Sequence, residues 1–406
     1  MSSTHAVESP YAWSRLFVSL ALSTIGGVGM WSVVVALPAV QADFGVDRGA
    51  ASLPYTLTML GFGAGSILAG RASDRYGIMA PLVATALALA AGFALAAFAP
   101  TLIVYAAVQG ALIGFGSSAT FSPLLAHMSQ WFDRRRGMAV AIVASGNYLA
   151  GAVWPPVVQH FIETSGWRPT YIGIGIFCAL TMVPLSLLFR EAAPAHGSHA
   201  PNPAVRRRPA PPLDVPLPTL QVLLTIAGLC CCVAMSMPQV HLVAYCSDLG
   251  YGPARGAQML SLMLACGVVS RLVFGWLSDR IGGLYTLLLG STLQGIALLL
   301  FLPFDGLVSL YLVSAMFGLF QGGIVPSYAI IIRDYFPARE AGARVGIVIT
   351  ATLVGMALGG YLSGAIFDWT GSYRAAFING IAFNLCNVAI VVWLVRRRRA
   401  PRPAFA

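Results

Sequence analysis

The sequence predicts an all-α membrane protein in which twelve transmembrane helices form two parallel six-helix repeats. Hydrophobic residues make up 58% of the 406-residue chain and charged residues only 9%, a proportion that a soluble protein of this length cannot bury. The apolar residues form long runs separated by short polar segments, and three short motifs occur twice at nearly the same spacing. Length, hydropathy and repetition therefore indicate the same fold class.

Runs of roughly 20 or more mainly apolar residues are long enough to cross the hydrocarbon core of a bilayer. In chain order they predict helices at 14–42, 50–73, 79–99, 101–131, 136–162, 169–189, 218–247, 256–278, 284–303, 306–334, 342–367 and 374–395. One interior stretch, 191–216, is polar and rich in Pro and Ala, which favours a flexible linker. The predicted domains are an N-terminal bundle at 1–190, this linker at 191–216, and a C-terminal bundle at 217–406.

The distribution of arginine predicts the orientation in the membrane. All 24 basic residues are arginines, and 19 of them fall in segments that are cytoplasmic if the amino terminus lies inside, against four in the opposite loops. This bias predicts a multi-pass plasma-membrane protein with both termini in the cytoplasm. The absence of lysine and the abundance of Ala, Gly and Arg favour a bacterial inner membrane.

Three motifs are repeated between the halves. GRASDRYG at Gly70 and GWLSDRIG at Gly275 lie 205 residues apart, as do GWR at Gly166 and GSYR at Gly371. WFDRRRG at residue 131 matches YFPAREAG at residue 335, 204 residues later. Parallel repeats imply a pseudo-two-fold axis along the membrane normal, with the substrate site near the midplane between the halves.

One arginine, Arg271, lies inside an apolar run. It precedes Asp279, at the polar end of its predicted helix, by eight residues, and therefore lies roughly 12 Å into the apolar layer. A guanidinium stays charged there at a cost of about 2.5–3.5 kcal/mol, so such a residue usually faces a water-filled cavity or a partner. Its planar donors fit a carboxylate, which makes Arg271 the first substrate-binding candidate. A structural arginine bonded to helix carbonyls or to a distant acid is the alternative.

The repeated pattern G-x-x-x-D-R-x-G after helices 2 and 8 resembles the major facilitator superfamily, over about residues 14–396. WFDRRRGMA before helix 5 and GGVGMW at 26–31 are similar to signatures of its monocarboxylate transporter and oxalate–formate antiporter branch. The resemblance implies that Arg271 stands where that family binds its substrate. The chain departs from animal members because Gly267 replaces their aspartate and helix 1 has no lysine, so their proton-handling scheme is not implied.

Further site candidates are a histidine and several aromatic or amide side chains near midplane depth. His241 is the best-placed group for proton coupling, because an imidazole titrates near pH ~6.5. A histidine bonded to a neighbouring helix is the equal alternative, and packing against lipid or protein is the alternative for the other candidates. The substrate-binding residues expected beside Arg271 and His241 are Trp31, Phe121, Tyr328, Asn147 and Tyr148.

Charged residues at the cytoplasmic helix ends predict a gate. An acid of the repeated Asp-Arg motif can pair with arginines elsewhere in one conformation only, and so bias the equilibrium between conformations. A bias of about 1–2 kcal/mol is sufficient. A purely topogenic role is the alternative. The gate candidates are Asp74, Arg75, Asp279, Arg280, Arg136 and Arg344.

No enzymatic motif is evident, since HExxH, P-loop and nucleophile-elbow patterns are missing, and we expect no catalytic residue. The seven cysteines lie in or beside apolar runs without metal-ligand spacing, so neither a metal nor a cofactor is expected. The net charge of +10 is divided among short clusters between apolar runs, which argues against nucleic acid as a partner. The expected surroundings are the lipid bilayer, and we expect a monomer.

Together these features predict a secondary active transporter of small monocarboxylate anions such as lactate or pyruvate, working by alternating access and coupled to protons. Arg271 is the one cation expected near the midplane, so a dicarboxylate would lack a partner for its second charge. An efflux carrier for drugs or other organic anions is the alternative among transporters. A transporter-like metabolite sensor is the alternative of another class.

Overall fold

The computed structural model describes residues 8–132, 135–190 and 213–398, without the side chains of Arg136, Ala338 and Arg339. These residues form helices joined by short turns. The elements are α1 (Pro10–Gly26), α2 (Val28–Phe44), α3 (Arg48–Tyr76), α4 (Met79–Ala97), α5 (Leu102–Val108), the π-helical η1 (Gln109–Gly114), α6 (Phe115–Ser118), α7 (Ser122–Met128), α8 (Arg136–Ser165), α9 (Trp167–Leu187), the short 3₁₀ turn η2 (Leu188–Arg190), α10 (Leu217–Asp248), α11 (Pro253–Ile281), α12 (Gly283–Leu300), α13 (Leu307–Gln321), α14 (Ile324–Tyr335), α15 (Ala338–Thr370) and α16 (Tyr373–Arg396).

The predicted all-α membrane architecture is confirmed. Within the described ranges, eleven helical spans are long and apolar enough to cross a bilayer. The 29-residue α3 is more polar, and it supplies the remaining crossing of the twelve that were predicted. Three spans are interrupted: α1 and α2 meet at Gly27, α6 and α7 at residues 119–121, and α13 and α14 at residues 322–323.

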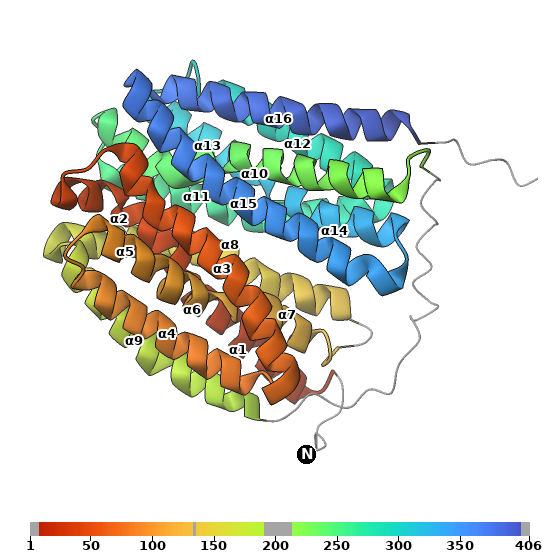
Figure 1. Ribbon diagram of the computed structural model, residues 1–406, viewed down its shortest axis with the longest axis horizontal. Coiled ribbons are helices and arrows are strands. Elements are labelled where there is room, and N and C mark those ends of the chain that lie inside the picture. Colours follow the sequence, from red (N-terminus) through yellow and green to blue (C-terminus); the bar gives the residue numbers. More distant parts are fainter. Residues whose placement is uncertain (1–7, 133–134, 191–212, 399–406) are drawn as a thin grey trace, which may run out of the picture.

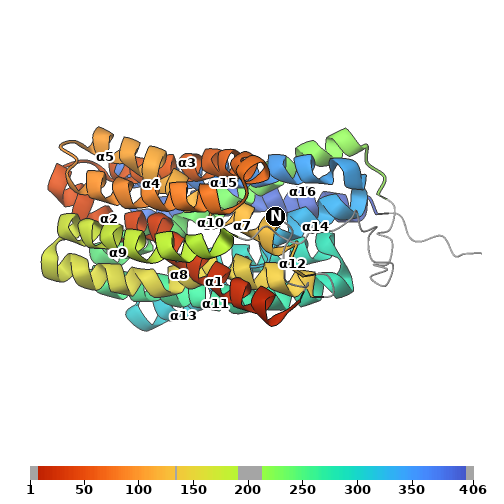
Figure 2. The same cartoon turned by 90° about the horizontal axis from the view of Figure 1, so that it is seen from below.

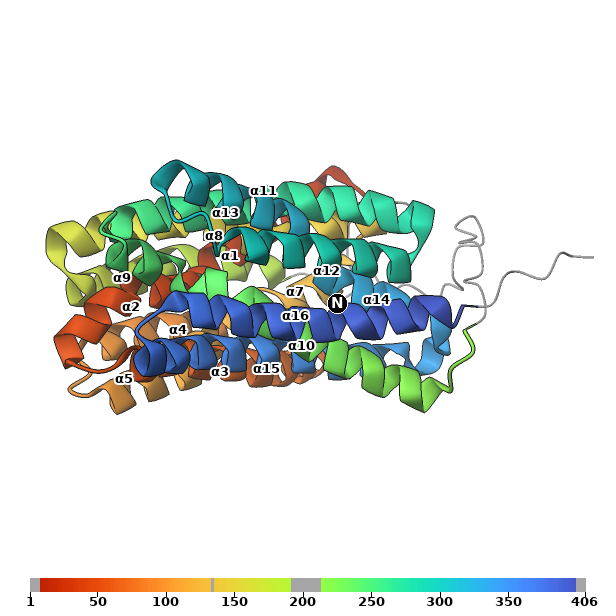
Figure 3. The same cartoon turned by 90° about the horizontal axis from the view of Figure 1, so that it is seen from above.

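The helices are arranged as two bundles, α1 to α9 and α10 to α16 (Figure 1). The bundles meet along two helix pairs on opposite sides of the molecule, where α3 lies beside α15 and α8 beside α11 (Figures 2 and 3). The apolar core of the second bundle continues across the interface to Trp31, Tyr55 and Tyr148 of the first. The domain limits at 1–190 and 217–406 stay a prediction, and residues 191–212 of the predicted linker lie outside the described residues.

The repeated motifs correspond to helix ends of the same kind in both bundles. Gly77 and Gly282, the last glycines of the two Asp-Arg motifs, have φ angles of 76° and 83°. Gly166 and Gly371, which begin the second repeated motif, have φ angles of 85° and 67°. Glycine adopts this left-handed region without the steric cost that a Cβ atom brings. We call the end where α3 begins and α15 ends the distal end, and the end where α1 begins and α16 ends the proximal end.

Glycines let helices within a bundle approach to backbone contact. A Cβ atom added to Gly61 of α3 would lie 1.9 Å from the carbonyl oxygen of Gly110 in η1. A Cβ atom added to Gly318 of α13 would lie 1.9 Å from the carbonyl oxygen of Met263 in α11. Membrane helices associate largely through such close packing, because lipid tails are as apolar as the side chains.

We expect Gly61→Ala to destabilise the protein by about 1–3 kcal/mol, because the new methyl group forces α3 away from η1. Gly70→Ala is the matched control on the same helix, since a Cβ atom there would meet nothing within 4 Å. The measurement is the unfolding temperature of both variants in detergent. Equal unfolding temperatures would show that the α3–η1 contact has little weight in the fold.

Candidate functional site

Arg271 lies on α11 and reaches across the interface to α8. Its Nη1 donates to the carbonyl oxygen of Ala144 at 2.9 Å, and its guanidinium carbon lies 4.4 Å from the centre of the Tyr148 ring. Carbonyl oxygens and a ring face both attract the cation without cancelling its charge. No carboxylate within the described ranges forms an ion pair with Arg271.

The same part of α11 satisfies the backbone where α13 and α14 are interrupted. The amide of Gly322 donates to Oγ of Ser270 at 3.1 Å, and the carbonyl oxygen of Gly322 accepts from Nε of Arg271 at 3.4 Å. Non-helical backbone is tolerated at membrane depth only where protein or a water-filled cavity satisfies it. Helix carbonyls therefore do bond Arg271, as the structural alternative expects, but its charge remains without a paired acid.

Tyr148 explains why the chain departs from the aspartate that animal relatives are expected to carry at position 267. A Cβ atom on Gly267 would lie 2.4 Å from two carbons of the Tyr148 ring. The ring thus occupies the space that an acidic side chain one turn from Arg271 would need. This packing keeps Tyr148 over the guanidinium and keeps an acid away from it.

Two further predicted site residues, Trp31 and Asn147, lie next to Tyr148. Nε1 of Trp31 donates to the backbone carbonyl of Asn147 at 3.2 Å, and Trp31 is only 6% exposed. A small pocket adjoins them, with a lining formed by Ser23, Gly27, Met30, Phe62, Ser117, Thr120, Phe121 and Asn147. A chain of contacts therefore runs from Arg271 to Tyr148, to the adjacent Asn147, and on to Trp31. Phe121 lines the same pocket as Asn147.

Tyr328 is not part of this group, contrary to expectation. It is fully buried in the second bundle, where its hydroxyl donates to Oδ1 of Asn387 at 3.0 Å. Nδ2 of Asn387 in turn donates to Oγ of Ser291 at 2.8 Å. The reason is rotation about the helix axis: the depth of Tyr328 was predicted, but its side chain points into the bundle.

His241 is also placed elsewhere, and the expectation that it lines a cavity with Arg271 is corrected. It is fully buried, with Nε2 at 2.8 Å from the carbonyl oxygen of Gly360 and Nδ1 at 3.1 Å from the hydroxyl of Tyr373. A carbonyl oxygen only accepts, so Nε2 carries the proton, and a neutral ring then accepts at Nδ1 from Tyr373. This is the helix-bonded histidine that the sequence left as the alternative.

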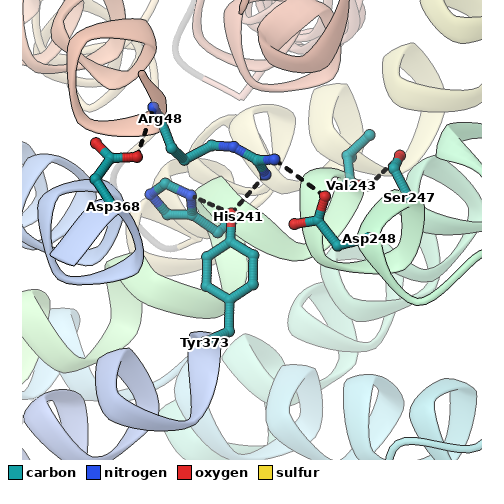
Figure 4. Close-up of polar contacts among 7 residues, drawn as sticks. All are labelled: Arg48, His241, Val243, Ser247, Asp248, Asp368 and Tyr373. Atoms are coloured by element: carbon teal, nitrogen blue, oxygen red, sulfur yellow. Dashed lines mark hydrogen bonds and ion pairs between the residues drawn. The ribbon is translucent and has the colours of Figure 1, made fainter. Parts of the chain in front are cut away.

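Tyr373, the partner of His241, belongs to a cluster of polar residues at the distal end that the sequence did not reveal (Figure 4). Nη1 of Arg48 donates to the Tyr373 hydroxyl at 2.8 Å, and Nη2 pairs with Oδ1 of Asp248 at 3.1 Å. The carboxylate of Asp368 accepts from the backbone amides of Arg48 at 2.8 Å and of Gly49 at 2.6 Å. We call the group Arg48, Asp248, Asp368 and Tyr373 the distal lock.

The distal lock joins the two bundles. Arg48 and Gly49 begin α3 of the first bundle, whereas Asp248, Asp368 and Tyr373 belong to α10, α15 and α16 of the second. Asp368 caps the amino terminus of a helix from the other bundle, where free amides and the helix dipole favour an anion. The only sequence signal was the position of these charges at helix ends in a chain with few charges.

Three of the proximal gate candidates contact residues of their own helix. Nη2 of Arg344 binds Oε2 of Glu340 at 2.7 Å, one turn away on the same helix. Arg75 stacks on Tyr76, with 5.3 Å from guanidinium carbon to ring centre, and Arg280 on Trp276, at 3.8 Å. The pairing of Asp74 or Asp279 with arginines such as Arg136 or Arg344 stays a prediction. The side chain of Arg136 lies outside the described residues.

Metal binding has no support in the part of the chain that the structure describes. No group of three His, Cys, Asp or Glu side chains there is arranged to hold an ion. What the geometry offers is one half-buried cation at the bundle interface, a pocket of about 10 Å³ lined by Asn147 and Phe121 among others, and a polar contact between the bundles at the distal end. That combination suits binding of a small anion and movement of two bundles, rather than bond-making chemistry.

The family of the chain follows from a match to a family model. The Major Facilitator Superfamily model matches residues 19–307 and 224–406. The chain belongs to the major facilitator superfamily. Its relatives in this superfamily are transporters, so the chain is a multi-pass membrane transporter and not an enzyme. The predicted resemblance and fold class are thereby confirmed.

Individual relatives point to the monocarboxylate branch of the superfamily. Monocarboxylate transporter 13 of Bos taurus is 28% identical over 352 residues, covering 85% of this chain and 79% of that protein. The protein of the same name from Rattus norvegicus is 29% identical over 353 residues, covering 85% and 78%. The structure of a bacterial homologue of the human lysosomal transporter Spinster aligns with a TM-score of 0.76 at 12% identity, over 97% of this chain and 100% of that one.

We expect Arg48→Gln and Asp368→Asn to loosen the distal contact between the bundles, because each removes a charged partner from the distal lock. The measurement is the distance between spin labels on Ile103 of α5 and Trp369 of α15, in a chain whose native cysteines are replaced. Both label sites are exposed at the distal end. The variants should broaden the distance distribution and shift it to longer values.

Arg168→Gln is the matched control for this experiment. Arg168 also forms a distal ion pair, at 2.9 Å to Oδ2 of Asp43, but both residues belong to the first bundle. Loss of this pair should leave the distance between the bundles unchanged. A shift as large as that of Arg48→Gln, or no shift in any variant, would contradict a bundle-joining role for the distal lock.

Proposed function

We propose that the chain is a secondary active transporter of small monocarboxylate anions and that it works by alternating access. The observation that carries the proposal is the charge of Arg271, which contacts carbonyl oxygens and a tyrosine ring but no carboxylate within the described ranges. A substrate carboxylate that binds the guanidinium through two parallel bonds would supply the missing counter-ion. The monocarboxylate transporters among the relatives support the same substrate class.

The distal lock gives the transport cycle a closed side. With both termini in the cytoplasm, as the arginine distribution predicts, the distal end faces the outside of the cell. The conformation described here is then closed to the outside. Opening it requires the loss of the distal lock and of the close packing of α3 on α15, where a Cβ atom on Gly364 would lie 2.8 Å from the carbonyl oxygen of Arg48, while each bundle retains its internal glycine-based packing.

The substrate should carry one charge. Arg271 is the cation at midplane depth, and Arg344 of α15 is already paired with Glu340 near the proximal end. A second carboxylate on the substrate would lose its hydration without gaining a partner, at a cost of several kcal/mol. Acids of the size of lactate, pyruvate or a short fatty acid meet this condition.

Proton coupling is a further part of the proposal, with His241 acting at the distal lock rather than on the substrate. A second proton on its ring would place an N–H at Nδ1 against Tyr373, which now donates there, and a positive charge near Arg48. Asp248 and Asp368 face the same cluster and would oppose this repulsion. Uptake driven by an imposed pH gradient in proteoliposomes tests the coupling, and uptake that ignores the gradient would exclude it.

Arg271→Lys should raise the KM for monocarboxylate uptake at least about tenfold, because lysine retains the charge but loses the planar fork. Arg255→Lys is the matched control, since Arg255 lies at the distal start of the same helix, where its Nη1 donates to Oε1 of Gln258 at 3.3 Å. The measurement is radiolabelled uptake into proteoliposomes by equal amounts of correctly inserted protein. Unchanged uptake by Arg271→Lys would remove this arginine from the binding site.

Unlabelled monocarboxylates should compete with a labelled monocarboxylate at least about tenfold better than oxalate or succinate at pH ~7, a difference that needs about 1.4 kcal/mol. The reason is the missing second cation near the midplane. Competition curves over a series of acids of two to six carbons measure the ratio. Stronger inhibition by oxalate than by every monocarboxylate would show that the site holds two positive groups.

A further inference from the structure

We propose that the outer face of α12 carries a binding site for one anionic phospholipid of the leaflet on the proximal side, with the lipid phosphate at Arg398 and one acyl chain in an apolar hollow beside it. The inference does not depend on which substrate the transporter carries. It assigns a ligand to a part of the surface that lies away from the helix pairs joining the two bundles.

The hollow has a volume of about 610 Å³. Its lining comes from the last residue of α11 and from one face of α12, and consists of Ile281, Tyr285, Leu288, Leu289 and Thr292. Tyr285 and Leu289 are 43% and 40% exposed, so the hollow opens away from the bundle. The hydroxyl of Thr292 donates to the carbonyl oxygen of Leu288 at 2.8 Å. The lining therefore offers mainly hydrocarbon surface to a ligand.

The hollow extends over the depth of one leaflet. It begins at the proximal end, where α11 ends and α12 begins. Thr292 follows Gly283, the first residue of α12, by nine residues and therefore lies roughly 14 Å along that helix. The hydrocarbon core of a bilayer is about 30 Å thick, so this depth is close to the midplane. An acyl chain of the leaflet on the proximal side has the length and the polarity to fill such a hollow.

Arg398 lies at the proximal mouth of the hollow. Its guanidinium carbon is 4.6 Å from the centre of the Tyr285 ring, and its side chain lies beside Tyr335 of α14. Asp214 and Asp334 are on the neighbouring segments, but no carboxylate within the described ranges forms an ion pair with Arg398. A ring face attracts the cation without cancelling its charge. Arg398 can therefore bind a phosphate through charge-assisted hydrogen bonds.

The fold holds the backbone of Arg398 in place from two sides. Arg398 follows the end of α16, and it pairs with Leu213 in an antiparallel bridge. Next to this bridge, the amide of Asp214 donates to the carbonyl oxygen of Arg397 at 3.0 Å. Leu213 itself packs against the core of the second bundle. A lipid bound at Arg398 would therefore stabilise the junction between the start of α10 and the end of α16.

Neighbouring residues place the membrane surface at the level of Arg398. Arg280 stacks on Trp276 at 3.8 Å and Arg397 on Trp393 at 5.1 Å, each on its own helix, and both tryptophans are exposed. Tryptophan and arginine side chains of this kind gather where the hydrocarbon meets the headgroups. Arg398 differs from both arginines because it reaches from α16 to a ring of α12, which brings its charge to the hollow.

The charge of the headgroup determines which lipid is preferred. Every phospholipid supplies an acyl chain, so the hollow alone does not distinguish one lipid from another. An anionic headgroup pairs with Arg398, and the hydroxyl of Tyr285 can donate to a second phosphate oxygen. Phosphatidylcholine carries the same phosphate together with a cation, which the guanidinium repels.

The test measures lipid binding to the purified full chain by native mass spectrometry. Phosphatidylglycerol and phosphatidylcholine with the same acyl chains are titrated separately. We expect the first phosphatidylglycerol to bind about fivefold more tightly than the first phosphatidylcholine, as one arginine near an anionic headgroup implies. Arg398→Gln should remove this difference and leave phosphatidylcholine binding unchanged. Leu289→Trp fills the hollow and should weaken the binding of both lipids.

Arg75→Gln and Leu299→Trp are the matched controls. Arg75 also lies at the proximal end and stacks on a tyrosine, Tyr76, but it has no contact with the lining of the hollow. Leu299 is exposed on the distal half of α12 and does not line the hollow. Both controls should bind the two lipids as the wild-type chain does. A preference that survives Arg398→Gln, or that Arg75→Gln removes equally, overturns the inference.

The unfolding temperature in detergent provides a second measurement. Phosphatidylglycerol should raise it more than phosphatidylcholine does, because a ligand of the folded state stabilises that state. This difference should disappear in Arg398→Gln, while the unfolding temperature without added lipid stays at the wild-type value. An equal effect of the two lipids on the wild-type chain would contradict recognition of the headgroup charge.

Other occupants of the hollow give distinct results in the same experiments. Glycerol 1-phosphate, which has the phosphate but no acyl chain, should not displace phosphatidylglycerol, and displacement would show a site for a soluble phosphate instead. A dimer that Leu289→Trp dissociates would show that a second copy of the chain covers the hollow. Either result overturns the inference.

Discussion

A guanidinium held inside an apolar layer is the constraint on which the rest of the interface depends. Arg271 stays charged at any depth, so the protein must provide acceptors for it or let it face water. The carbonyl of Ala144, the carbonyl exposed at the α13–α14 interruption, and the face of Tyr148 provide them. Gly267 follows from this arrangement, because only glycine leaves room for the ring. One charge thus accounts for an interrupted helix, a glycine and a stacked aromatic residue.

Contacts within a bundle and contacts between bundles both include close backbone packing, and the distal contact between the bundles adds polar groups. Inside a bundle, Gly61 against Gly110 and Gly318 against Met263 bring backbones together with no room for a side chain. Such packing resists change, since any shift opens a void or creates a clash. Between the bundles at the distal end, a Cβ atom on Gly364 would lie 2.8 Å from the carbonyl oxygen of Arg48, and the distal lock adds one ion pair and a helix cap supplied in trans. Opening of the distal end would expose the charged groups of the distal lock to water, which can hydrate them again, whereas the packing inside each bundle would be unchanged.

The sequence predicted the helices well and the side-chain directions only in part. The expected limits 79–99 and 218–247 correspond to Met79–Ala97 and Leu217–Asp248, because hydropathy reports the length of the apolar layer directly. The depth of Arg271 followed from counting residues along one helix. Tyr328 and His241 were misplaced, because core and lipid are both apolar and the sequence pattern does not reveal which face of a membrane helix points inward.

The sequence also did not predict which residues far apart in the chain would contact each other. Arg48 and Asp368 are separated by 320 positions and meet only because α3 packs against α15. The two residues are unremarkable in isolation, since charged residues are common at the ends of membrane helices. The Tyr148 ring beside Gly267 is a similar case: the resemblance marked the missing acid, but only the packing explains what replaced it.

The position of Arg271 also gives a reason for substrate binding and bundle movement to be coupled. The donor that would hold a carboxylate is the same Nη1 that now bonds Ala144 across the α8–α11 interface. A substrate that occupies both arms of the guanidinium competes with this contact, so binding weakens one link between the bundles as it forms another. A ligand shifts a conformational equilibrium only through such differential contacts. By reciprocity, a conformation that frees Arg271 from Ala144 must bind the anion more tightly, and the difference in affinity equals the coupling free energy. Coupling then requires no relay through the bundles, since a single side chain belongs both to the interface and to the site.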